Sequence, residues 1–139
     1  MFDISSTAVA PTAAMHVKNA KGEFLYDADK NPVRIHVHGP GTAAFAEVEA
    51  RQTQRHFRRK EENDGKVAVA APDVRRIEEA EDLAAITASF ENLGYGGGKL
   101  TGTDLFKAVY ADPALGFVAL QVRKFVGDWG NFSGGSATA

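Results

Sequence analysis

Residues 33–42, VRIHVHGPGT, contain the junction between the two kinds of regular structure that the chain is expected to form. Apolar and polar residues alternate from Val33 to His38, which is the pattern of a half-buried strand. The run Gly39-Pro40-Gly41 stops that strand, and Thr42 can cap a helix that starts directly after it. The decapeptide therefore predicts strands before residue 39 and a helix from residue 42.

The chain before this junction predicts a small N-terminal β-hairpin or meander over residues 15–39. Residues 15–18 alternate in polarity, and residues 23–26 form a second short strand candidate. The acidic stretch at residues 27–32, DADKNP, is rich in residues that satisfy the backbone of a turn. Residues 1–14 are expected to form a flexible segment outside the hairpin.

The chain after the junction, residues 42–132, is predicted to be helical. A first helix over residues 42–62 carries one apolar stripe and a second stripe of arginines. A second helix runs from Pro72 to Leu93, because its apolar residues recur at steps of three and four while acidic residues crowd the other side. The apolar positions used are Phe45, Val48 and Phe57 in the first helix, and Val74, Ile77, Leu83, Ile86, Phe90 and Leu93 in the second.

Two shorter helices are predicted after the glycine-rich run at residues 94–98. The first starts at a threonine, and the second follows Asp112-Pro113. Residues 133–139 are expected to form a flexible tail of serine, glycine, alanine and threonine. The predicted fold class is thus α+β, mainly α, with about four helices and a single domain over residues 15–132.

Composition limits the function as well as the fold. The 139 residues, of which 44% are hydrophobic and 24% charged, fit one folded domain. The absence of cysteine excludes disulfides, thiolate zinc sites and thiol nucleophiles, and fits a reducing cytosol. A net charge of −2 supplies no overall field to attract nucleic acid, and no apolar run approaches the roughly 20 residues of a bilayer span. We therefore expect a cytoplasmic protein with neither nucleic acid nor membrane as partner.

The most specific hypothesis for a catalytic site involves three histidines. If the strands around Val17 and Ile35 pair antiparallel, His16, His36 and His38 share one face, within reach of a common metal ion. Arg34 and Lys18 would lie on the same face and repel a cation, and no carboxylate is expected beside the histidines. A solvated strand face is the favoured interpretation.

Two further stretches have part of a ligand-binding pattern. Asp27, Asp29 and Asn31 match the first ligands of a calcium loop, but Pro32 and His38 occupy the positions that need glycine and glutamate. The glycine run before Lys99 matches neither a phosphate loop nor a dinucleotide-binding loop in its spacing. A plain turn and a connection between helices are the favoured interpretations.

The arginines of the first predicted helix form a basic strip. Such a strip suits a nucleic-acid surface, but only Phe57 supplies an interleaved aromatic ring. We favour a solvated face that pairs with the acidic strip of the second helix, either within one subunit or between subunits. Arg51, Arg55 and Arg58 are therefore candidate partner-binding residues.

Aromatic residues are concentrated near the end of the chain. Phe125, Trp129 and Phe132 are the second set of candidate partner-binding residues, because aromatic side chains anchor many protein interfaces. The alternative is that such residues complete a small core. For Trp129 and Phe132, which follow the last predicted helix, the two interpretations have equal weight.

Residues 21–132 resemble the tail assembly chaperones of siphovirus-like tailed phages and prophages. The resemblance lies in the order and spacing of several short motifs, each of which is unspecific alone. These motifs are Gly22-Glu23, the acidic turn at residues 27–31, Pro32-Val33, Gly39-Pro40-Gly41-Thr42 before an arginine-rich helix, TASFEN at residues 87–92, LFKAVYADP at 105–113, LGF at 115–117, QV at 121–122 and FVGDWGNF at 125–132.

The resemblance implies a non-enzymatic protein without cofactor or catalytic residues. Members of the family coat the helix-rich tape measure protein, help to recruit tail tube protein, and are absent from the finished virion. A longer, frameshifted form with an extra domain occurs in the family. Coating a long partner favours head-to-tail self-association. Two other classes stay open: a structural virion component, such as a head completion or decoration protein, and a metal-dependent enzyme built on the three histidines.

Overall fold

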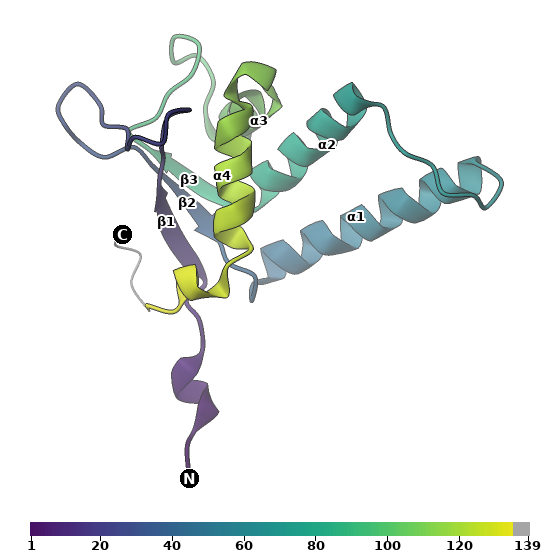
Figure 1. Cartoon of the computed structure of the whole chain (residues 1–139), viewed down its shortest axis with the longest axis horizontal. Helices are drawn as coiled ribbons and strands as arrows, with labels where there is room; N and C mark the ends of the chain where they lie inside the picture. The colour runs from purple at the N-terminus through teal and green to yellow at the C-terminus, as the bar shows by residue number, and fades with distance from the viewer. Residues whose placement is uncertain (135–139) are drawn as a thin grey trace.

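The computed structural model describes residues 1–134 and has a three-stranded antiparallel sheet with helices packed on it (Figure 1). Four α-helices and three strands make up most of the described chain, which confirms the predicted α+β, mainly α class. The strands, in spatial order, are β1 (Thr12–His16), β2 (Arg34–His38) and β3 (Thr87–Glu91). The helices are α1 (Ala43–Glu62), α2 (Pro72–Ala85), α3 (Gly102–Ala111) and α4 (Gly116–Val126). Short 3-10 turns lie at Ile4–Thr7, Pro113–Leu115 and Trp129–Phe132.

The predicted hairpin is present as the antiparallel pair of β1 and β2. Met15 lies opposite Ile35 in the register, as expected from the alternation of polarity. Two details differ from the prediction. The strand candidate at residues 23–26 contributes only isolated bridges, and β1 begins at Thr12, so residues 12–14 are not part of a flexible segment. The predicted tail falls largely on residues 135–139, which lie outside the described residues.

The second predicted helix is shorter than expected, because α2 ends at Ala85 and residues 87–91 form β3. The prediction of continuous helix up to residue 93 is therefore wrong, as is that of an all-helical region after residue 42. β3 pairs antiparallel with the edge of β2 that β1 leaves free. Phe90 then packs on Phe106 with 4.6 Å between ring centroids. Tertiary pairing thus outweighs the helical spacing of the apolar residues.

One face of the sheet forms the core together with α2, α3 and α4. Met15, Val17, Ile35 and Val37 are buried on that face, and Ile35 and Val37 have no exposed surface. The opposite face carries His16, His36 and other polar side chains, which are partly exposed. In Figure 1, α4 crosses in front of the sheet, with α3 beside it.

Helix α1 projects away from this body (Figure 1). Its predicted bounds are confirmed, and the hydroxyl oxygen of Thr42 caps it by accepting a hydrogen bond from the Phe45 amide at 3.3 Å. Its 20 residues extend about 30 Å at the usual rise per residue. Val48 is its only buried residue, so apolar packing holds α1 near its start only.

Candidate protein-binding surfaces

The arginine strip of α1 lies against the acidic face of α2. Arg55 Nη1 lies 2.9 and 2.8 Å from the two carboxylate oxygens of Asp82. Arg51 Nη2 lies 3.0 Å from Oδ1 of Asp82, and Gln52 donates to Oδ2 at 3.2 Å. The Asp82 side chain is only 9% exposed, so these donors replace the water that its charge would otherwise need.

Further ion pairs extend the contact toward the outer end of α1. Arg55 also lies 3.8 Å from Glu78 and 3.5 Å from Glu81, and Arg59 pairs with Glu78. The pairing of the basic and acidic strips within one subunit, which was one of two predicted alternatives, is therefore confirmed. Arg58 differs from its neighbours, because it is exposed and forms no salt bridge within residues 1–134.

The three predicted aromatic binding residues occupy different environments. Phe132 is 1% exposed and belongs to the core, so it is not available on the surface. Its ring packs over Gly39, where an added Cβ would lie 2.8 Å from Cδ2 of the ring. Phe125 is partly buried and meets Phe132 at 5.6 Å between ring centroids. Trp129 is 56% exposed and is the one of the three that presents a large apolar surface to solvent.

A set of exposed apolar side chains between residues 57 and 77 was not predicted from the sequence. Sequence reasoning placed three of them in buried stripes and treated the others as part of a connector, residues 67–71. The sequence of the connector could have indicated an exposed apolar surface, because five consecutive apolar residues are unusual in an exposed loop. The exposed residues are Phe57, Val67, Val69, Val74 and Ile77.

The face of the sheet that carries the histidines also carries a carboxylate. β3 brings Oε1 of Glu91 to 2.6 Å from Nε2 of His36, and Oε2 to 3.3 Å from Nη1 of Arg34. The expectation that no carboxylate lies beside the histidines is therefore wrong, because it was based on two strands only. The hydrogen bond from His36 is the main cause that lowers the pKa of Glu91 below its ordinary value.

His16 is engaged differently from His36. Its Nε2 lies 2.9 Å from the carbonyl oxygen of Leu25, and its ring stacks on Phe24 at 4.4 Å between centroids. Within residues 1–134, no three histidine or carboxylate side chains are grouped so that they could hold a metal ion. The Nε2 atoms of both His16 and His36 thus contact oxygen atoms of the chain itself.

The two loops that partly match ligand-binding patterns are ordinary connections. A carboxylate oxygen of Asp27 accepts hydrogen bonds from the amides of Asp29 and Asn31, both at 2.9 Å, which is a local turn as predicted. The glycine run at residues 94–98 has three consecutive glycines with positive φ and joins β3 to α3, rather than one helix to another.

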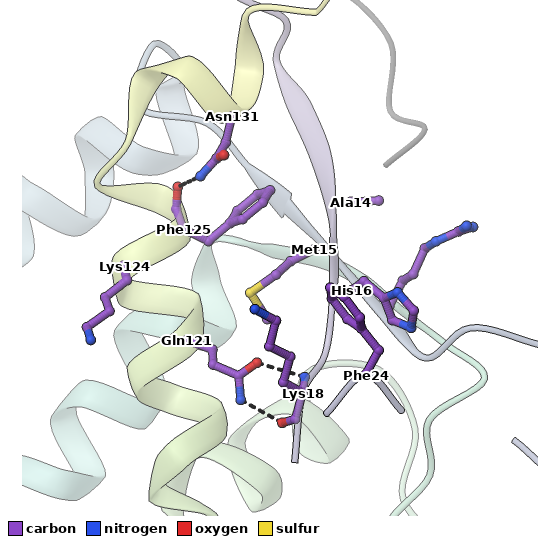
Figure 2. Close-up of a pocket in the computed structure, with 10 residues that line it drawn as sticks. Ala14, Met15, His16, Lys18, Phe24, Gln121, Lys124, Phe125 and Asn131 are labelled. Atoms are coloured by element: carbon purple, nitrogen blue, oxygen red, sulfur yellow. Dashed lines mark hydrogen bonds between the residues drawn. The ribbon is translucent and has the colours of Figure 1, made fainter. Parts of the chain in front are cut away.

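A cavity of about 520 Å³ lies at the outer edge of β1, between that strand and α4 (Figure 2). Met15 and Phe125 form its apolar part on the core side, and Phe24 lies on the histidine side. Its charged lining residues in the described chain are Lys18, Arg34 and Lys124, which are all cationic. Figure 2 shows Gln121 closing one end through two hydrogen bonds to the Lys18 backbone.

Comparison of the chain with family models, with curated proteins and with solved structures gave no significant match. No single helix of the described residues is long and apolar enough to cross a membrane. The pair formed by residues 102–111 and 113–126 reaches the required length and composition together, but it is bent by 83°.

Proposed function

We propose that this chain is a non-enzymatic tail assembly chaperone of siphovirus-like phages or prophages. It binds the tape measure protein and helps to recruit tail tube protein in the host cytoplasm, and it is absent from the mature virion. The proposal starts from the motif resemblance over residues 21–132. The structural observation that supports it best is the exposed outer face of α1.

The outer face of α1 consists of Gln54, Phe57, Arg58 and Glu61. These residues recur at the i, i+3, i+4, i+7 spacing that places side chains on one side of a helix, and all four are exposed. Phe57 is 58% exposed. An aromatic ring flanked by one cation and one anion suits contact with another helix, and a tape measure protein is helix-rich by the resemblance.

The ion pairs around Asp82 keep α1 in a fixed position, with its outer face accessible to a partner. They lie on the side of α1 that faces α2, so the outer face takes no part in them. Beyond Val48, α1 is thus fixed by polar contacts rather than by a core, and its outer surface is preformed. A preformed surface loses less conformational entropy on binding than a flexible one.

Co-expression with the tape measure protein encoded downstream tests the proposal. We expect the two proteins to co-elute in size-exclusion chromatography and mass spectrometry to find no copy of this chain in purified virions. Presence in virions without co-elution would instead identify a structural virion component and refute the chaperone proposal.

A pair of charge reversals tests the assigned surface. Arg58→Glu should reduce the retained tape measure protein at least about tenfold, because it places a like charge beside Glu61 and removes the cation. Lys107→Glu on α3 is the matched control, since Lys107 is also an exposed helical cation without a salt bridge in residues 1–134. Equal retention by the two variants would show that the outer face of α1 is not the binding surface.

A further inference from the structure

Among the described residues, none pairs with the middle of the outer edge of β1. In the part of the chain that the structure describes, β1 pairs with β2 alone. The hydrogen bonds from Val17 to Val33 (2.9 Å) and from Gly39 to Pro11 (2.8 Å) show which residues point inward. In an antiparallel pair, residues alternate between facing the partner and facing away. Since odd-numbered residues of β1 face β2, the backbone groups of Thr12, Ala14 and His16 point outward.

Described residues pair with both ends of this edge, but none of them pairs with its centre. The Ala10 amide donates to the Phe132 carbonyl at 2.8 Å. At the other end the Lys18 amide donates to Gln121 Oε1 at 2.8 Å, and Gln121 Nε2 donates to the Lys18 carbonyl at 2.7 Å. Within residues 1–134, the outward backbone groups of residues 12, 14 and 16 have no hydrogen-bond partner. The open stretch has the length of a short added strand.

The first residues of the chain have the features of such a strand. In Figure 1 the segment before β1 extends away from the body. Phe2 and Ile4 are 71% and 74% exposed, and Asp3 between them has extended backbone angles, with φ −92° and ψ 106°. Asp3 caps the 3-10 turn Ile4–Thr7, so Ile4 has to leave that turn when the strand forms. In a strand, Phe2 and Ile4 would share one face and Asp3 would lie on the other.

We propose that residues 1–4 of one copy add as a strand to the open β1 edge of a second copy. Phe2 and Ile4 then face the apolar side of the cavity, which is formed by Met15 and Phe125. Asp3 faces the opposite side, toward Lys18. The backbone hydrogen bonds hold the strand, and the cavity side chains select it.

Charge complementarity supports this choice of occupant. Asp3 is the only charged side chain among residues 1–11, and the charged residues that line the cavity are all cationic. Residues 5–8 are exposed and connect the added strand to Val9 and Ala10, which already contact the body of their own copy. In Figure 1 the segment before these contacts extends away from that body, which favours the edge of a neighbouring copy. The contact is heterologous, so repetition gives a ring or an open filament. This inference does not depend on the proposed chaperone function.

Two variants test the added strand and the β1 edge independently. Phe2→Ser/Ile4→Ser removes the apolar side chains of the added strand, and Ala14→Pro removes an outward amide from β1 while leaving the bonds to β2 intact. Multi-angle light scattering of the full-length protein should show assembly of the wild type and at least about tenfold weaker assembly of each variant. A mixture of the two variants should form a 1:1 pair and nothing larger, because it contains one intact strand and one intact edge.

A charge exchange provides a test that does not use proline. Asp3→Lys and Lys18→Glu should each weaken assembly, and the double variant should restore it. Circular dichroism checks that each variant is folded. A wild type that stays monomeric at all concentrations would overturn the proposal. Assembly that is unchanged in all variants, or a mixture that gives no pair, would overturn it as well.

Discussion

Replacement of Asp82 by alanine tests whether ion pairs, rather than apolar packing, position α1. The Asp82 carboxylate accepts hydrogen bonds from Arg51, Gln52 and Arg55, and it is the most buried acid in the contact between the helices. Beyond Val48, no residue of α1 is buried. Asp82→Ala therefore removes the central contact between α1 and α2.

The expected loss of stability depends on which acidic partners and how much solvent Arg51 and Arg55 keep in the variant. Breaking a buried ion pair costs about 3–5 kcal/mol when the remaining charge is left without a partner. Arg55 keeps Glu78 at 3.8 Å and Glu81 at 3.5 Å, and the Arg51 side chain is 41% exposed to solvent. These compensations reduce the cost, so we expect the free energy of unfolding to fall by about 2–3 kcal/mol.

Urea denaturation followed by circular dichroism measures this change. With a slope of roughly 1.5 kcal/mol per molar urea, the midpoint should fall by about 1.3–2 M. Glu79→Ala is the matched control on the same helix, because Glu79 pairs with Arg123 at 3.1 Å while both side chains are well exposed. That variant should lose less than about 1 kcal/mol. Equal midpoints for the two variants would refute the assignment of α1 to polar anchoring.

Two further substitutions test the core and the histidine face. Gly39→Ala should lower the free energy of unfolding by about 1–3 kcal/mol, because its Cβ would lie 2.8 Å from the buried ring of Phe132; Gly94→Ala, with no atom within 4 Å, is the control. Glu91→Gln should flatten the acid limb of a thermal stability profile. The pKa of Glu91 is lowered in the fold, mainly by His36, so its stabilising contribution is present above the ordinary value of 4.5 and is lost as the pH falls through the lower folded value. A variant with an unchanged acid limb would contradict that role.

The sequence predicted well those parts of the fold that depend on residues close together in the chain. The strand–glycine–threonine sequence at residues 33–42 predicted the end of β2 and the start of α1, because cap and breaker residues act on their immediate neighbours. β3 could not be predicted in the same way. Ile86, Phe90 and Leu93 continue a helical spacing, and only the free edge of β2, far away in sequence, favours a strand at residues 87–91.

For the contact between α1 and α2, the sequence predicted which residue types pair, but not their geometry. The complementary charges of α1 and α2 indicated that the helices could pair, but periodicity alone does not give the angle that buries Asp82 between Arg51 and Arg55. Phe132 was undecided between core and interface because the space for its ring is created by Gly39, a residue of another element. The exposure of Val74 and Ile77 likewise depends on how far α2 extends beyond the body.

The central position of β2 affects the order in which the protein can be made. On the ribosome, the hairpin of β1 and β2 emerges early and α1 can form from local contacts, whereas the second neighbour of β2 arrives only with Thr87–Glu91. Until then β2 exposes a row of unpaired amides and carbonyls, a template for pairing with other chains. Nascent chains that stop before residue 87 should therefore pair with other chains through this edge of β2, and those that extend past residue 91 should lose that pairing as β3 covers the edge.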